Sequence, residues 1–227
     1  MMIKPYKISV PKSTLNNIYK KVRSYPWKMM QNVNGWEYGT NYNYLKKISK
    51  YWVSKYNWKK FENKINSFKN YKTNVDGINL HFIIEKSKNT KSRPLLLLHG
   101  WPGSVIEFFD IIPRLAHPEK FGGKIEDGFD IIVPSLPGFG FSTPIKKALG
   151  PRRIGKILNK FMVKNLRVIK IILYKVGIGE QLLQLGLVSI VQNIVKVFIL
   201  IAYRLDIQKG QKIIKKKNGK KNLILIK

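Results

Sequence analysis

The chain contains no cysteine and few histidines or acidic residues. Its 227 residues include three histidines, and 12 Asp and Glu stand against 43 Lys and Arg, for a formal net charge of +31. The absence of cysteine excludes a disulfide framework and thiolate chemistry. The three histidines fit no metal-ligand spacing, so we expect neither a metal nor a cofactor.

The excess of positive charge favours two classes of partner, nucleic acids and anionic membrane surfaces. Lys, Asn and Ile are abundant in most segments, as expected from an A+T-rich coding sequence. No basic region has a recognised nucleic-acid-binding pattern, so we do not expect nucleic acid as a partner, whereas membrane-surface association stays open. The first six residues contain no apolar run long enough for a signal peptide or a membrane anchor.

Residues 1–70 have the pattern of a helical region rich in aromatic side chains. Apolar residues recur at helical spacing after Ser13, which we expect to cap a first helix that ends by Pro26. A second helix is indicated over residues 44–56, and a third begins at Trp58. We predict that the aromatic stripe of these helices packs and contributes no catalytic residue.

From residue 71 the pattern changes to strands that alternate with helices. Apolar runs at 73–75 and 78–84 flank Asp76-Gly77, a dipeptide that favours a type I′ hairpin turn. Ser104 is placed to cap a helix that ends near Pro113, and helical spacing returns over 154–166. This alternation indicates a parallel sheet with helical crossovers.

Two apolar runs end in glycine- and proline-containing turns. Four leucines at 95–98 continue directly into HGWPGS (99–104), and residues 129–134 lead into SLPGFGFS (135–142). A buried strand followed by His-Gly-X-Pro predicts a tight turn whose backbone N–H groups point at open space. Such a turn can hold an oxyanion.

Four stretches together resemble one enzyme family. HGWPGS and VPSLPGFGFS, preceded by NGWEYGTNYNYL (34–45) and VDGINLHFI (75–83), are similar to epoxide hydrolases of the microsomal and juvenile-hormone type in the α/β-hydrolase superfamily. The resemblance implies an α/β fold with an N-terminal helical meander (1–70) and strands one to four of an α/β-hydrolase sheet (71–166). The lid and the C-terminal half of the family's fold are lacking.

The family resemblance also implies an activity and a location. It implies hydrolysis of small lipophilic epoxides to vicinal diols through a covalent aspartyl ester, in juvenile hormone catabolism or detoxification. The implied location is the endoplasmic reticulum or microsomal membrane. Because this chain has no membrane anchor, a cytoplasmic location is the alternative.

The resemblance assigns roles to a few positions only. His99, Gly100, Trp101 and Pro102 match the turn that contributes to the family's oxyanion hole through the backbone N–H of Trp101. The family's nucleophilic aspartate falls on Ile178, and the general acid, the base and the lid tyrosines have no counterpart. We therefore expect no catalytic residue in this chain and no measurable epoxide hydrolysis.

The two remaining histidines, His81 and His117, match no catalytic motif. Each is expected to be a surface or loop histidine.

Residues 167–227 depart from the family pattern. The family segment near GYKNYFIQGGDWGA is expected here, but residues 167–181 read RVIKIILYKVGIGEQ. Codons for this stretch that are read in a shifted frame can spell the family segment, and 189–201 allows further family sequence in the same frame. We interpret residues from about Arg167 onward as out-of-frame translation that leaves a basic, disordered tail; the alternative is a tail that binds phosphates.

This interpretation makes the chain an inactive N-terminal fragment of an epoxide hydrolase. Two alternatives are an inactive partial domain with an interaction role and a basic protein that binds anionic surfaces. Within the tail, residues 171–174 are apolar enough to fill the place of the family's fifth strand, and 180–202 can be drawn as a helix.

Overall fold

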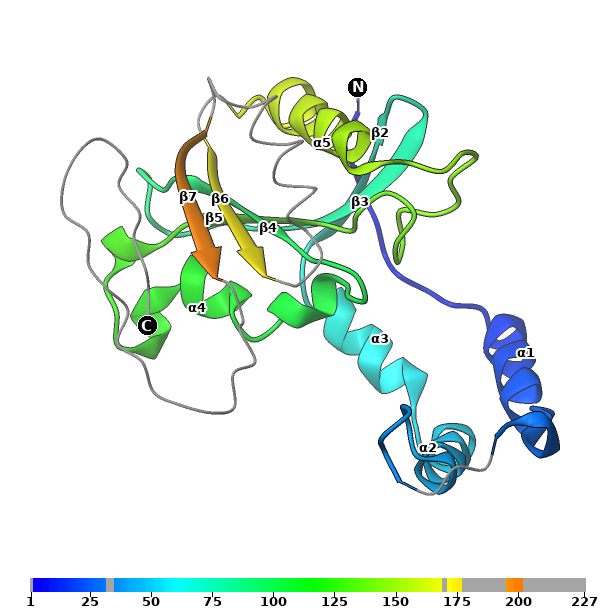
Figure 1. Ribbon diagram of the computed structural model, residues 1–227. Helices are drawn as coiled ribbons and strands as arrows, with labels where there is room; N and C mark the ends of the chain where they lie inside the picture. The colour runs from blue at the N-terminus through cyan, green and yellow to red at the C-terminus, as the bar shows by residue number, and fades with distance from the viewer. Residues whose placement is uncertain (1, 32–34, 169–170, 177–194, 202–227) are drawn as a thin grey trace. The chain divides into compact units, whose positions relative to one another are not determined.

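The computed structural model describes residues 2–31, 35–168, 171–176 and 195–201 (Figure 1). The chain divides into two compact units: Lys7–Ser67 is helical, and Met1–Tyr6 together with Phe68–Lys227 contains the sheet. Within each unit, local sequence features determine where the helices and strands start and end.

The described residues of the helical unit form three α-helices and a short 3-10 helix. Their bounds are α1 Lys12–Arg23, the 3-10 helix Trp27–Met29, α2 Tyr42–Ser54 and α3 Trp58–Asn66. Asn41 caps α2 by accepting the N–H of Tyr44, and Asn57 caps α3 in the same way. The predicted Ser13 cap is wrong: α1 follows Pro11 without a side-chain cap, and Ser13 lies inside its first turn.

Two side chains of α3 hold the extended segment that precedes α1. Asn66 accepts the N–H of Ile8 at 2.9 Å and donates to the carbonyl of the same residue at 2.7 Å. The Asn66 side chain thus makes the two backbone hydrogen bonds that a residue of a neighbouring strand would make. Glu62 accepts the N–H of Val10 at 2.7 Å. Hydrogen bonds from Lys59 and Val10 lower the pKa of Glu62 to about 2, so this carboxylate is ionised at neutral pH.

The other unit is built on a seven-stranded sheet. Its strands are β1 Lys4–Pro5, β2 Asn70–Val75, β3 Ile78–Glu85, β4 Pro94–Leu98, β5 Asp130–Pro134, β6 Ile171–Val176 and β7 Val195–Ile201. The order is β1-β2-β3-β5-β4-β6-β7. Strands β1, β2, β3 and β5 pair antiparallel, whereas β5, β4, β6 and β7 are parallel. The α/β fold class is therefore confirmed.

The hairpin between β2 and β3 turns where the sequence predicts it. Asp76 and Gly77 both have positive φ, 53° and 82°, as a type I′ turn requires. The pairing runs from Asn70 opposite Ile83 to Val75 opposite Ile78. A short, sequence-local signal is thus enough to set this register.

Helices cover both faces of the sheet (Figure 1). On one face, α5 (Pro151–Lys160) and the π-helical turn Phe161–Asn165 form a core with alternate residues of β3, β4 and β5, among them Phe82, Leu96 and Ile132. On the other face, α4 (Ile112–Ala116) contacts β3 and β5. The intervening leucines of β4 are also buried, which explains why this parallel strand is apolar throughout.

The predicted helix that ends near Pro113 is wrong in its extent. A 3-10 helix spans Val105–Phe108, and Pro113 lies in the first turn of α4. Proline is suited to this place because the first turn of a helix needs no N–H from it. Two further 3-10 helices, Pro118–Phe121 and Ile125–Asp127, lead to β5.

Strand β4 has a neighbour on each side. β6 pairs with it in parallel, with Leu95 opposite Ile172 and Leu98 opposite Lys175, which confirms that residues 171–174 can fill the fifth-strand position. The helix drawn over 180–202 is wrong where the structure describes it, because Val195–Ile201 is strand β7. Its β-branched and aromatic residues favour a strand over a helix.

Candidate active site

The strand order places one turn at the point where ligands bind in open α/β sheets. After β4 the chain crosses to β5 on one side of it, and β6 lies on its other side. The loop after β4 therefore begins where the strand order reverses, at the carboxyl end of the parallel strands. This loop is His99–Gly103, the turn that the sequence singles out.

The His99 side chain joins this turn to the loop after β5. Its Nε2 accepts the N–H of Leu136 at 3.0 Å, so the ring proton lies on Nδ1, which donates to the carbonyl of Gly100 at 3.0 Å. The ring is 1% exposed and meets Phe139 edge-on at 5.4 Å. Burial lowers the pKa of His99, although the hydrogen bond to Gly100 opposes this shift. His99 is therefore a neutral link between two loops.

Trp101 lies within the turn and is largely exposed to solvent. Its side chain is 75% exposed, and its peptide bond to Pro102 is cis. The hydrogen bonds among the described residues include none donated by the Trp101 N–H. Among the described residues this donor therefore has no partner, and an unpaired backbone N–H is what an oxyanion hole requires.

A capping box follows the turn directly. Ser104 and Glu107 form a capping box, in which the Ser104 N–H donates to Glu107 Oε1 at 3.0 Å. A Cβ on Gly103 would stand 1.9 Å from that oxygen and 2.9 Å from the carbonyl oxygen of Gly100. Only glycine fits between the turn and its cap.

The structure brings together the four predicted turn residues, His99, Gly100, Trp101 and Pro102. Ile178, the position that matches the family's nucleophile, lies two residues past the end of β6 and outside the described residues. His117 lies at the junction of α4 and the next 3-10 helix, where Nε2 is 2.8 Å from Glu85 Oε1.

The prediction for His81 is wrong. It is a fully buried residue of β3, with neither ring nitrogen exposed to solvent. Its hydrogen-bond partners are Asn70, Ser135 and Ser142, which sequence reasoning missed. The available signal was weak: a histidine in an otherwise apolar strand, and two serines in the loop SLPGFGFS.

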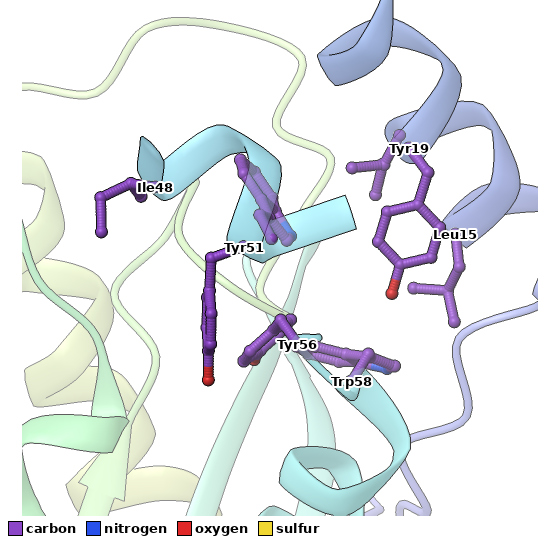
Figure 2. Close-up of a pocket in the computed structure, with 8 residues that line it drawn as sticks. Leu15, Tyr19, Ile48, Tyr51, Tyr56 and Trp58 are labelled. Atoms are coloured by element: carbon purple, nitrogen blue, oxygen red, sulfur yellow. The ribbon is translucent and has the colours of Figure 1, made fainter. Parts of the chain in front are cut away.

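A second concave site lies within the helical unit. An apolar groove of about 480 Å³ lies between α1, α2 and the start of α3. Figure 2 shows Leu15 and Tyr19 of α1 facing the side chains from α2 and from the start of α3. Its lining is Leu15, Ile18, Tyr19, Ile48, Tyr51, Trp52, Tyr56 and Trp58. In the described part of the chain, α1 and α2 bury none of their residues, so this lining is largely open to solvent.

Comparison with known families decides the assignment. Residues 3–108 match the family model described as the epoxide hydrolase N terminus, and residues 93–179 match the α/β hydrolase fold. A Stigmatella aurantiaca protein provisionally named an epoxide hydrolase is 42% identical over 161 residues, which cover 70% of this chain and 37% of that protein. The chain belongs to the epoxide hydrolase family.

The relatives of this chain include both expected types. Juvenile hormone epoxide hydrolase 1 of Ctenocephalides felis is 35% identical, with 70% of this chain and 35% of that protein covered. Epoxide hydrolase 1 of Oryctolagus cuniculus is also 35% identical, with 71% and 37% covered. The chain thus spans little more than a third of the length of these curated relatives.

A solved structure of an epoxide hydrolase supports the same fold for this chain. The juvenile hormone epoxide hydrolase of the silkworm Bombyx mori superimposes with a TM-score of 0.74 at 28% identity, over 87% of this chain and 46% of that one. In the described ranges, no three His, Cys, Asp or Glu side chains are grouped to hold a metal ion. No helix among the described residues is both long and apolar enough to cross a bilayer.

Proposed function

We propose that this chain carries the oxyanion half of an epoxide hydrolase active site and is inactive by itself. The observation that carries the proposal is the His99–Gly103 turn at the switch point of the sheet, in which the Trp101 N–H has no hydrogen-bond partner among the described residues. The proposal that the substrates are small lipophilic epoxides rests only on membership of the family.

The reaction in question needs two steps, of which this chain supports part of the second. In the first, a carboxylate attacks an epoxide carbon, the carbon–oxygen bond breaks, the released oxygen takes a proton from a general acid, and a hydroxyalkyl ester forms. In the second, an activated water attacks the ester carbonyl, and negative charge develops on the carbonyl oxygen. A Trp101 N–H directed at that oxygen would stabilise it, while His99 holds the turn in place.

The first step requires a nucleophile that we do not find in the sequence. The family's aspartate position falls on Ile178, which cannot attack an epoxide. We propose that residues from about Arg167 onward are read out of frame, which would remove the nucleophile together with the acid, the base and the lid. Sequencing of the transcript across Leu166 tests this directly: a shifted frame that does not encode GGDWG contradicts it.

The activity prediction uses two matched variants at one position. We expect this chain and its Trp101→Ala and Trp101→Pro variants to hydrolyse styrene oxide at the same background rate, measured as diol formation. Alanine keeps the backbone N–H and proline removes it. Turnover by the parent and by Trp101→Ala that Trp101→Pro lacks would show a working oxyanion hole and would contradict inactivity.

A second candidate function is binding of the helical unit to an anionic lipid surface. Residues 7–67 contain thirteen Lys and Arg against two acidic residues, Glu37 and Glu62. Five of the eight residues that line the groove are Tyr or Trp, whose apolar rings and polar tips suit the boundary between lipid and water. The charge and the open aromatic lining both favour an anionic bilayer as the occupant.

Vesicle sedimentation tests this second candidate. We expect binding to phosphatidylcholine vesicles only when phosphatidylglycerol is present, and weaker binding at high salt. Trp52→Ser, within the groove, should weaken binding roughly tenfold, which corresponds to about 1.4 kcal/mol. Trp36→Ser, outside the groove but 60% exposed, is the control. Equal losses in both variants, or equal binding to neutral vesicles, would contradict the assignment.

A further inference from the structure

A buried polar cluster lies beside the oxyanion turn, across strand β5. His81 is fully buried, and Ser135, Ser142 and Asn70 are 1%, 1% and 6% exposed. Strand β5 lies between β3 and β4, so His81 on β3 and His99 after β4 flank the end of β5 from opposite sides. The residues that follow β5, Ser135 and Leu136, contact one histidine each.

The hydrogen bonds determine where the His81 proton lies. The Asn70 side chain donates from Nδ2 to the carbonyl of Phe68 at 2.8 Å, so its Oδ1 is the atom that faces His81 Nε2 at 3.0 Å. Nε2 therefore carries the proton, and Nδ1 accepts from Ser135 Oγ at 2.9 Å. Burial, with a smaller contribution from Lys72, lowers the pKa of His81 to about 3.

This Ser-His-Asn arrangement is not a second hydrolytic site. Ser135 is buried, and two neighbouring aromatic rings pack against the histidine, with Tyr6 at 5.9 Å and Phe141 at 5.3 Å between ring centres. No substrate can reach the serine oxygen. The cluster must act through the backbone that it holds.

That backbone is the peptide between Ser135 and Leu136. Its carbonyl accepts from Ser142 Oγ at 2.7 Å, and Ser142 Oγ accepts the N–H of His81 at 2.9 Å. The N–H of the same peptide donates to His99 Nε2 at 3.0 Å. Because a peptide is planar, fixing its carbonyl on one side fixes the direction of its N–H on the other.

We propose that Ser142, held by the backbone N–H of His81, positions the oxyanion turn. The relay runs from the His81 backbone N–H to Ser142 Oγ, from Ser142 to the 135–136 peptide, from that peptide to His99 Nε2, and from His99 Nδ1 to the Gly100 carbonyl. The catalytic meaning of the turn rests on the proposed function. The relay itself ends on the imidazole ring of His99, so it can be tested there without turnover.

The three histidines of this chain make the test direct. With ¹⁵N-labelled histidine at pH 7, the unmodified chain should show His81 protonated on Nε2 and His99 protonated on Nδ1. Ser142→Ala should move the His99 Nε2 resonance downfield, toward that of an unbonded ring nitrogen, because the 135–136 peptide is released. Ser87→Ala, a serine of the same unit outside the relay, should leave it unchanged.

Each result bears on the relay. His99 protonated on Nε2 in the unmodified chain, or a His99 resonance that Ser142→Ala does not move, would overturn the proposal. The tautomer measurement needs no variant, so the proposal stays testable if Ser142→Ala fails to fold. Loss of stability without a change at His99 would show a merely structural role. An active or inactive chain in the epoxide assay leaves this readout unaffected.

Discussion

Phe82→Ala is expected to lower the free energy of unfolding of the sheet unit by about 3–5 kcal/mol, the usual cost of deleting a buried phenylalanine. Phe82 on β3 is fully buried. Its ring stacks on Tyr71 at 5.7 Å and meets Phe161 edge-on at 4.7 Å, so it joins the hairpin to the helix that covers this face.

The measurement is urea unfolding followed by circular dichroism, with Phe121→Ala as the matched control. Phe121 is 47% exposed, so the same substitution should cost much less there. A shift of the midpoint that is equal for both variants would mean that the core around Phe82 does not form in solution.

The second large effect is a dependence on pH. We expect the free energy of unfolding to fall by about 2 kcal/mol between pH 7 and pH 5, because of His81. An unfolded histidine binds a proton below about pH 6.5, whereas burial holds the pKa of native His81 at about 3. The free energy of unfolding is therefore highest above pH 6.5. It decreases as the pH falls, because the unfolded state binds a proton at His81 that the native state does not bind.

Other groups modify this pH dependence in known directions. The pKa of His99 is also lowered by burial, so it adds to the loss in the same pH window. Burial raises the pKa of Glu107, so its native form keeps a proton more readily and opposes the loss. His81→Gln removes the titrating ring and should flatten the profile by about 2 kcal/mol relative to the parent chain. Parallel profiles for the two would contradict the burial of a neutral His81.

Local signals in the sequence predict the features that depend on neighbouring residues. Asp76-Gly77 predicts a hairpin because positive φ at both positions is a property of the dipeptide. The leucines of β4 predict a buried parallel strand, and the glycines and proline after it predict the turn. Membership of the epoxide hydrolase family follows from the same stretches.

The features that the sequence does not predict depend on distant partners. The burial of His81 depends on Ser135 and Ser142, which are more than fifty positions away. The position of His81 within β3 does not by itself determine whether its side chain lies on the buried or the exposed face of the strand. Pro113 is compatible with either the end or the start of a helix. In the structure it lies in the first turn of α4, which packs against the sheet. The apolar run at 195–201 has residue types that favour a strand, but its place in the sheet depends on pairing with β6.

The two borders of the sheet would meet another chain in different ways. On one side, β1 is two residues long, contains a proline without an N–H, and places Lys4 opposite Lys72, all of which discourage the addition of a further strand. On the other side, β7 has β6 as its one neighbour among the described strands, and its sequence VKVFILI carries a single charge. Among the described strands, the β7 border is therefore more open to the addition of a strand from another chain than the β1 border.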